Sequence, residues 1–196
     1  MRYSRVMKAT FRFHNRFLAA FLVLFFGIAA DTGAALAQTA KLDELFTGLL
    51  AADDAGADQI VTEIWIEWSK SGSPSIDLLL QRGRAALAAG VPQVAIEHLT
   101  AAIDQDPAFA EAWNARATAY FQTGDLGPSV ADIAHVLTLN PRHFGALSGL
   151  GMIFEELGKP DKALEAYKAA LAVNPHMPDV KTSVERLEKD LAGQDL

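Results

Sequence analysis

The chain has 196 residues, of which 51% are hydrophobic and 21% are charged, a composition typical of folded globular proteins rather than disordered ones. It contains no cysteine, which excludes disulfide bonds, thiolate metal sites and cysteine nucleophiles. Residues 38–196 hold 12 basic and 23 acidic residues and therefore have a net charge of −11. A segment this acidic is repelled by phosphate groups, which disfavours binding to nucleic acid or to an anionic membrane surface.

The first 37 residues have the three parts of a secretory signal peptide. Five basic residues precede an unbroken apolar run of 14 residues, Phe17–Ala30, and the small residues Ala35 and Ala37 follow it. The run is shorter than the roughly 20 apolar residues that a membrane-spanning helix needs. We therefore predict cleavage after Ala37 and export, to the periplasm if the source is a double-membraned bacterium. The alternative is an uncleaved membrane anchor.

The sequence after residue 75 contains an internal repeat of 34 residues. This spacing separates Gly90, Gly124 and Gly158, and it also separates Pro107, Pro141 and Pro175. The two series in register predict three repeats, 76–109, 110–143 and 144–177. In each repeat, apolar residues at helical spacing flank the glycine, and the proline ends the second segment. Each repeat is therefore expected to form two antiparallel helices.

Further positions agree between the repeats. The fourth, eighth and eleventh positions hold Leu79, Trp113 and Leu147, then Gly83, Ala117 and Gly151, then Ala86, Tyr120 and Phe154. The twentieth, twenty-fourth and twenty-seventh hold Ala95, Ser129 and Ala163, then Leu99, Ile133 and Tyr167, then Ala102, Val136 and Ala170. This pattern resembles the tetratricopeptide repeat. The resemblance implies an all-α solenoid of stacked antiparallel helix hairpins. Small residues at positions 8, 20 and 27 would let the helices approach closely, and large ones at 4, 11 and 24 would fill the space between them.

Both ends of such a repeat array need a cap. Residues 178–196 predict a C-terminal capping helix over 178–191 and a tail, with Val180, Val184 and Leu187 on the apolar face of the helix. Residues 38–75 predict an N-terminal repeat-like hairpin over 42–52 and 58–69 with Gly56 at its break, followed by a turn.

Two tryptophans lie in the second helix of this N-terminal hairpin. We expect Trp65 and Trp68 to seal the hairpin onto Leu79 and Leu80 of the first repeat. An exposed aromatic patch is the alternative. Ser75 or Asp77 is expected to cap the helix that follows the turn.

The chain has no recognisable active-site motif. GxGxxG, GxxxxGK[ST], HExxH and GxSxG are all absent from the sequence. The histidines after residue 37 lack the spacing of a metal site, and the adjacent acids Asp53-Asp54 and Glu155-Glu156 are expected to be solvated. We predict a non-catalytic protein with no cofactor and no metal.

The resemblance also implies a binding surface. In tetratricopeptide-repeat proteins, the outward positions of each first helix line a concave groove that holds a peptide or helix of a partner. Carried over to this sequence, the candidate partner-binding residues are Gln81, Arg84, Asn114, Thr118, Phe121, Gln122, Ser148, Met152 and Glu155. Truncation of Arg84 or Phe121 to alanine is expected to weaken the binding of a partner without lowering the stability of the fold. Ordinary solvated surface is the alternative for each residue.

Family members that hold a chaperone's terminal carboxylate use Lys or Asn at five groove positions. Here these positions hold Leu80, Arg84, Ala115, Gly145 and Gly149, of which only Arg84 is basic. Capture of an acidic carboxyl-terminal tail is therefore disfavoured.

The leading functional hypothesis is an exported protein-protein interaction adaptor or scaffold in cell-envelope assembly. Its partners would be one or more envelope proteins, with no nucleic acid and no membrane contact by the mature domain. The alternatives are an accessory subunit of a dedicated envelope machine for cytochrome c maturation, cell division or outer-membrane assembly, a self-associating structural protein, and a hydrolase with an unrecognised site.

Overall fold

The computed structural model describes residues 38–194, and every regular element in that range is a helix. The chain divides into two units between Glu44 and Leu45. The described part of the first unit, residues 38–44, is helical. The predicted signal segment 1–37 and its cleavage after Ala37 lie outside the described residues. All that follows concerns residues 45–194 of the second unit.

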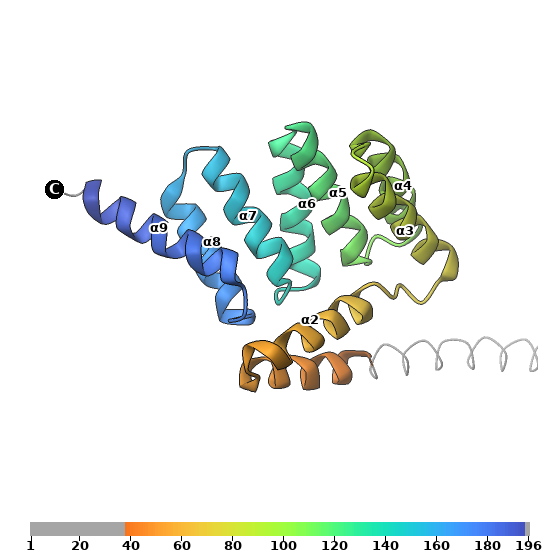
Figure 1. The fold of residues 1–196 in the computed structure, drawn as a ribbon. Coiled ribbons are helices and arrows are strands. Elements are labelled where there is room, and N and C mark those ends of the chain that lie inside the picture. The colour runs from red at the N-terminus through yellow and green to blue at the C-terminus, as the bar shows by residue number, and fades with distance from the viewer. Residues whose placement is uncertain (1–37, 195–196) are drawn as a thin grey trace, which may run out of the picture. The chain divides into compact units, whose positions relative to one another are not determined.

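Eight labelled helices follow the short helical stretch 45–51 in this unit. They are α2 (Asp54–Trp68), α3 (Pro74–Ala88), α4 (Pro92–Gln105), α5 (Ala110–Thr123), α6 (Leu126–Leu139), α7 (Phe144–Glu156), α8 (Pro160–Val173) and α9 (Pro178–Gln194). Helices α3 to α8 form three hairpins that lie side by side in chain order, with α9 after the last (Figure 1). The predicted all-α architecture of stacked hairpins is confirmed.

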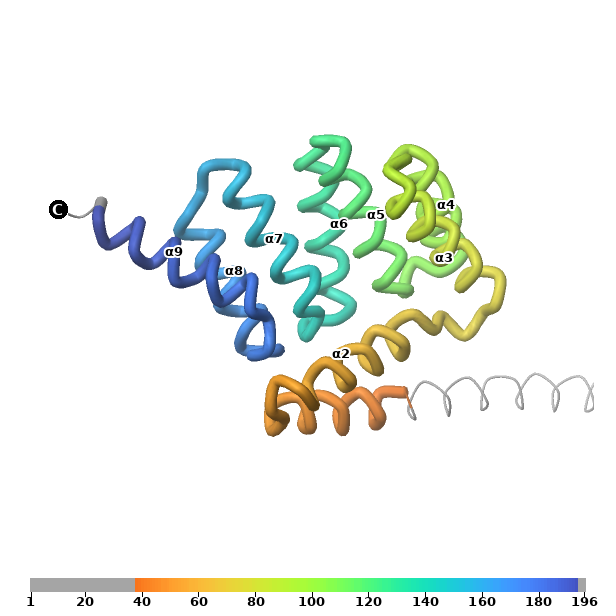
Figure 2. The backbone as a smooth tube through the Cα atoms, viewed as in Figure 1, coloured from red at the N-terminus to blue at the C-terminus, as the bar shows by residue number. Residues whose placement is uncertain are grey.

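The turn inside each hairpin is made by a glycine in the left-handed region. Gly90, Gly124 and Gly158 have φ of 71°, 81° and 64°, a conformation that residues with a Cβ rarely adopt. Figure 2 shows the backbone reversing direction at each of these turns. The predicted break at each glycine is therefore confirmed.

The end of each second helix is also the same in all three repeats. Asp106, Asn140 and Asn174 are the C-cap residues of α4, α6 and α8, directly before the three prolines. The side-chain oxygen of each accepts a hydrogen bond from the backbone N–H two residues further on, at 3.0, 3.1 and 3.0 Å. This local turn, together with the proline, directs the chain into the next hairpin.

The two helices of a hairpin touch where small and large residues face each other. A Cβ on Gly83 would lie 2.5 Å from Leu99, and one on Gly151 would lie 2.4 Å from Tyr167. In the second repeat, Ser129 is fully buried, and its Oγ donates a 2.7 Å hydrogen bond to the Ala117 carbonyl. The predicted packing of positions 8, 20 and 24 is thus confirmed, and the serine in place of alanine has a backbone partner.

The C-terminal cap is present as predicted and extends to Gln194. Val180, Val184 and Leu187 of α9 are buried in one cluster with Ala163 and Tyr167 of α8. This helix therefore covers the apolar face that the last repeat would otherwise expose.

The N-terminal hairpin differs in its break from the predicted repeat-like hairpin. Gly56 lies inside α2 rather than at the break, and the helix begins after Asp53, whose carboxylate accepts a 2.9 Å hydrogen bond from the Gly56 N–H. The physical reason is that Asp53 is a strong N-cap, so the helix begins at Asp54, four residues earlier than the repeat frame implies.

The two tryptophans of α2 also have other neighbours than predicted. Trp65 and Trp68 pack against His143 and Phe144 at the start of α7, whereas Leu80 belongs to a separate cluster with α4 and α5. The hairpin is therefore not an additional member of the stack. Its second helix passes the N-terminal end of α7.

The turn before α3 is stabilised differently from the predicted cap. Helix α3 begins at Pro74 after Ser73, and no side-chain hydrogen bond caps it. Asp77 instead accepts hydrogen bonds from the backbone N–H and the hydroxyl of Ser71, at 2.8 and 2.7 Å. These bonds hold the 71–77 turn that joins α2 to the repeats.

Within residues 38–194, no helix combines the length and the apolar character needed to cross a membrane.

Candidate binding groove

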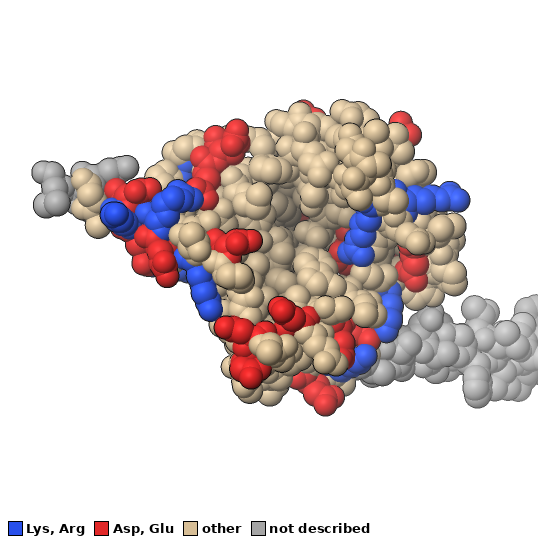
Figure 3. Space-filling view, in the orientation of Figure 1, with Lys and Arg blue, Asp and Glu red and all other residues tan. Residues whose placement is uncertain are grey.

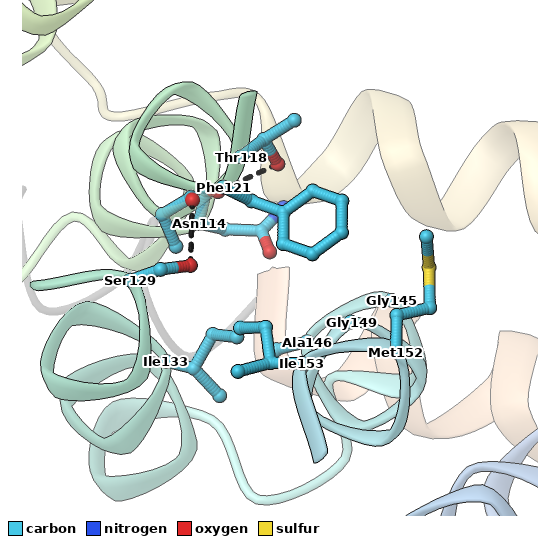
Figure 4. A pocket seen from close by; sticks show the side chains of 11 residues that line it. Asn114, Thr118, Phe121, Ser129, Ile133, Gly145, Ala146, Gly149, Met152 and Ile153 are labelled. Atoms are coloured by element: carbon cyan, nitrogen blue, oxygen red, sulfur yellow. Dashed lines mark hydrogen bonds between the residues drawn. The ribbon is translucent and has the colours of Figure 1, made fainter. Parts of the chain in front are cut away.

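A small pocket opens between α5 and α7, with α6 beneath it. It has a volume of about 100 Å³. Figure 4 shows Phe121 and Met152 at its mouth and Ile133 and Ile153 at its floor. The pocket is lined by Asn114, Ala117, Thr118, Phe121, Ser129, Ile133, Gly145, Ala146, Gly149, Met152 and Ile153. Its lining is mainly apolar, and the Asn114 amide and the Thr118 hydroxyl supply polar groups.

A larger pocket of about 620 Å³ lies where α2 meets α7 and α9. Helix α2 contributes side chains at i, i+3 and i+7, which lie on one helix face. The pocket is lined by Asp58, Val61, Trp65, Phe144, Gly145, Ser148, Met152, Tyr167, Asn174, His176, Met177, Pro178, Asp179, Val180 and Ser183.

Gly145 and Met152 line both pockets, so the two form one elongated depression, which we call the groove. Figure 3 shows a hollow in the middle of this face that is bordered mainly by uncharged residues. Gly145 is needed there because a Cβ on it would lie 2.8 Å from the Trp65 ring. Met152, with 49% of its surface exposed, contributes to the lining of both pockets.

An aromatic cluster anchors α2 beside the groove. The Trp68 ring stacks on the His143 imidazole with centroids 4.4 Å apart, and the Trp65 ring meets Phe144 edge-on at 5.6 Å. Trp65 and Trp68 also pack edge to face with each other at 5.3 Å. Such pairs add to the stabilisation that burial of the rings provides.

Behind this cluster, buried polar groups join the first helices of the three hairpins, α3, α5 and α7. Glu111 is 1% exposed and accepts hydrogen bonds from Arg84 and, at 2.7 Å, from Nε2 of His143. Nδ1 of His143 accepts a bond from the Ala146 N–H, which assigns the ring proton to Nε2. Arg84 also donates to Ser69 at 2.7 Å, so this network joins the end of α2 to α3, α5 and α7.

A second ion pair joins the two helices of the second repeat, and its arginine also reaches the first repeat. Arg116 donates two hydrogen bonds to the Asp132 carboxylate, at 2.8 and 2.9 Å, and a third to Thr100. The hydrogen bond to Asp132 raises the pKa of Arg116 above its usual value. This guanidinium is thus committed to the structure.

A third group of polar side chains lies at the α7–α9 end. The Tyr167 hydroxyl donates a 2.8 Å hydrogen bond to Glu155, whose other oxygen accepts from Arg186. Burial, and then the hydrogen bond to Glu155, raises the pKa of the Tyr167 phenol above its usual value. Glu155 therefore has two partners and is not a free carboxylate.

The start of α2 is attached to the loop between α8 and α9. The His176 ring faces Asp54 Oδ1 with Nδ1, at 2.7 Å, and the Leu49 carbonyl with Nε2, at 3.2 Å. The hydrogen bond to His176 lowers the pKa of the Asp54 carboxyl. Together with the Ser69–Arg84 bond, this contact fastens α2 at both of its ends.

The groove contains five of the nine candidate residues predicted from the sequence. Asn114, Thr118, Phe121 and Met152 meet in the smaller pocket, and Ser148 lines the larger one. Gln81 and Gln122 are exposed and line neither pocket.

The other two candidates, Arg84 and Glu155, are held by ion pairs. Removal of Arg84 would leave Glu111 buried without its cation, so we now expect a loss of stability rather than none.

Sequence reasoning did not find the residues that α2 and α9 bring to the groove, among them Asp58, Val61, Trp65 and Asp179. The i, i+3, i+7 spacing of the first three marks a common helix face. It does not show where that face is placed. Among residues 38–194, no group of three or more His, Cys, Asp or Glu side chains is arranged to hold a metal ion.

The fold and the groove define a helical-hairpin repeat protein with an elongated binding surface. Residues 80–128 and 145–177 each match a family profile of the tetratricopeptide repeat, and both profiles describe a repeat rather than an enzyme. A tetratricopeptide repeat-containing protein of Rhizobium etli is 37% identical over 167 residues, which are 85% of this chain and 82% of that protein. The chain belongs to the tetratricopeptide-repeat family.

Solved structures show the same fold. The first repeat domain of Spaghetti (RPAP3), bound to the HSP90 peptide SRMEEVD, matches with a TM-score of 0.59 at 24% identity and covers 61% of this chain and 98% of its own. A crystal structure of MamA matches with a TM-score of 0.57 at 23% identity and covers 81% of this chain and 84% of its own.

Proposed function

We propose that this protein is an exported, non-catalytic adaptor that holds a peptide segment or helix of a partner protein in the groove. The observation that carries the proposal is the joining of the two pockets at Gly145 and Met152. A continuous depression with apolar walls and a few polar groups suits a polypeptide, whose side chains enter successive pockets. The fold neighbour Spaghetti (RPAP3) was solved with a bound peptide, which supports this use of the fold.

The finer part of the proposal is the setting. The basic start, the 14-residue apolar run and the Ala35 and Ala37 pair support export, and an exported adaptor would act in cell-envelope assembly. Two alternative functions are an accessory subunit of an envelope machine and a self-associating structural protein. The experiment below distinguishes them from a general adaptor.

The test is photo-crosslinking from inside the groove in the native cells. A photoreactive phenylalanine analogue replaces Met152, which is exposed, and in a matched control it replaces Val94, which is 42% exposed on α4 and lines neither pocket. The proposal predicts a specific protein cross-linked from position 152 and not from position 94. The identity of that protein separates a general adaptor from a machine subunit.

A variant with the groove filled completes the test. Gly149→Leu places an uncharged side chain in the smaller pocket, where the atom nearest to a Cβ would be Ile133 Cδ1, at 3.7 Å. It should abolish the cross-link. Thr118→Trp is the alternative if the first variant melts early. A cross-link only to a second copy would replace the adaptor proposal by self-assembly, and equal yields from both positions would refute it.

Export has its own measurement. The intact mass of the protein recovered from cells should correspond to a chain that begins at Gln38. A mass that includes residues 1–37, in protein released without detergent, would contradict export with cleavage.

A further inference from the structure

We infer that the groove selects partner segments in which a basic side chain stands beside apolar ones, and that α2 and α9 together supply this selectivity. The inference rests on the proposed function, because it names the chemistry of the segment that the groove would hold. It follows from the charges, the apolar lining and the shape of the larger pocket.

The charged groups that line the larger pocket are acidic. Asp58 of α2 and Asp179 of α9 both line it, and both are exposed to solvent. Within the described residues, neither carboxylate takes part in an ion pair or accepts a side-chain hydrogen bond. No Lys or Arg lines either pocket. His176 also lines the pocket, but its ring nitrogens face the Asp54 carboxylate and the Leu49 carbonyl. A cation that enters this pocket would therefore meet two carboxylates from different helices.

Two arginines of the helices around the groove are already paired. Arg186 of α9 is paired with Glu155, and Arg84 of α3 is paired with Glu111. The pKa of the Asp54 carboxyl is lowered by His176 and then by Lys181 of α9. Neither arginine is therefore a free cation that could compete for Asp58 or Asp179.

The walls of the pocket suit the aliphatic stem of a basic side chain. Val61, Trp65, Phe144, Met152, Met177 and Val180 supply apolar surface. Lys and Arg bury their methylene groups against such surface and keep the charged end near water or a carboxylate. The aromatic rings add attraction for a cation that lies over their faces.

The smaller pocket selects for an apolar neighbour. It shares Met152 and Gly145 with the larger pocket, so a chain that puts a basic side chain into one can place an adjacent residue in the other. The floor formed by Ile133 and Ile153 favours an aliphatic or aromatic side chain. This continuity favours a polypeptide over a compact small molecule.

The charge is opposite to that needed for the peptide seen in the fold neighbour. That peptide, SRMEEVD, carries three acidic side chains near its end. Asp58 and Asp179 would repel such a segment. We therefore expect a different class of partner segment from the one bound by that neighbour.

In the experiment, immobilised protein (residues 38–196) selects from a library of random dodecapeptides displayed on phage. The affinity of the protein for synthetic copies of the selected peptides is then measured. We expect enrichment of sequences with Lys or Arg within two residues of an apolar residue. Replacement of that basic residue by Gln should weaken binding about twofold to fivefold, as is usual for exposed ion pairs.

The protein variants test the same interaction from the other side. Asp58→Asn/Asp179→Asn should bind the selected peptides about twofold to fivefold more weakly than the parent, and this binding should depend less on salt. The control Asp104→Asn/Asp161→Asn makes the same change in net charge on α4 and α8, outside both pockets, and should bind like the parent.

Two kinds of failure can be told apart. Selected peptides that are acidic or show no charge preference, or that bind Asp58→Asn/Asp179→Asn as tightly as the parent, overturn the inference and leave the groove proposal standing. Failure to enrich any peptide, or enriched peptides whose binding survives Gly149→Leu in a folded protein, overturns the proposed function itself.

Discussion

Gly151 has no side chain because the ring of Tyr167 occupies the space where its Cβ would be. The contact would be 2.4 Å, and both residues belong to the tightly packed interior of the third hairpin. Gly149, two residues earlier in α7, has room for a Cβ, which would make an ordinary van der Waals contact with Ile133 at 3.7 Å. Two glycines in one helix thus have different roles, and only neighbouring helices distinguish them.

Gly151→Ala and Gly149→Ala should therefore change stability in opposite directions. We expect the first to lower the free energy of unfolding by about 1–3 kcal/mol through overpacking. The second should raise it by up to about 1 kcal/mol because alanine favours the helix. Urea denaturation of both variants and the parent measures this. A stabilising Gly151→Ala would show that α7 and α8 are further apart than described.

The phenol of Tyr167 makes stability depend on pH in the alkaline range. Its pKa is raised in the folded state from an ordinary value of about 10, so the protonated form is favoured by folding. Its contribution is complete below about pH 10 and is lost as the pH rises through the raised pKa. Stability curves above pH 10 should therefore fall less steeply for Tyr167→Phe than for the parent. Tyr120→Phe is the control, and identical slopes for all three proteins would refute the assignment.

At the scale of elements, α2 is a strap across the repeats rather than a repeat. Asp54 at its start is bound to His176, Trp65 in its last turns lies on Gly145, and Ser69 after its end is bound to Arg84. These contacts come from the third hairpin and its loop at one end and from the first hairpin at the other. Because both of its ends are held in this way, α2 lies beside α7 and lines one side of the larger pocket.

Trp68 is the main apolar anchor of this strap. It is 8% exposed and packs on His143, Phe144 and Phe46. Trp68→Ala should cost about 3 kcal/mol by cavity formation. Amide hydrogen exchange should show the largest acceleration in α2. Ile66→Ala, on the exposed side of α2, should leave exchange unchanged. Acceleration that is confined to α3 and α4 would contradict the described position of α2.

At the scale of the whole unit, stability is distributed along the stack. The buried residues form successive clusters, each shared by neighbouring helices, as expected for a solenoid. The cluster of Val180, Val184 and Leu187 ends this series. A destabilising substitution in this last cluster should therefore loosen the neighbouring helices and leave the first hairpin largely unaffected.

Leu187→Ala tests this expectation. Leu187 is 3% exposed, and its truncation should lower the free energy of unfolding by about 2–4 kcal/mol. Hydrogen exchange should accelerate most in α9 and α8. Leu99→Ala, in the first hairpin, is the matched comparison and should affect α3 to α5 most. The same uniform acceleration in both variants would show that the unit unfolds as a single block.

Much of the fold follows from the sequence because its interactions are local and repeated. The left-handed glycines at 90, 124 and 158, the prolines after each second helix and the small residues at positions 8 and 20 act within one 34-residue unit or between neighbours. Because each of these residues recurs in three repeats at the same spacing, the repeat pattern can be recognised in the sequence. Asn114, Thr118, Phe121, Ser148 and Met152, which the same register selects as candidate binding residues, line the two pockets, and their role in binding stays a prediction.

The course of α2 was decided by tertiary structure alone. Its sequence shows an amphipathic helix with two tryptophans, and such a helix can bury its apolar face against any apolar surface of matching shape. The surface that it covers belongs to residues some 80 positions further along the chain, Phe144 and Gly145, and no local pattern encodes that pairing. The same holds for Arg84, whose buried partner Glu111 is 27 residues away. The sequence by itself determined the repeats and one wall of the groove. Long-range packing decided the other wall, because the hydrophobic effect that drives it has no direction and the contact is selected only by the assembled shape.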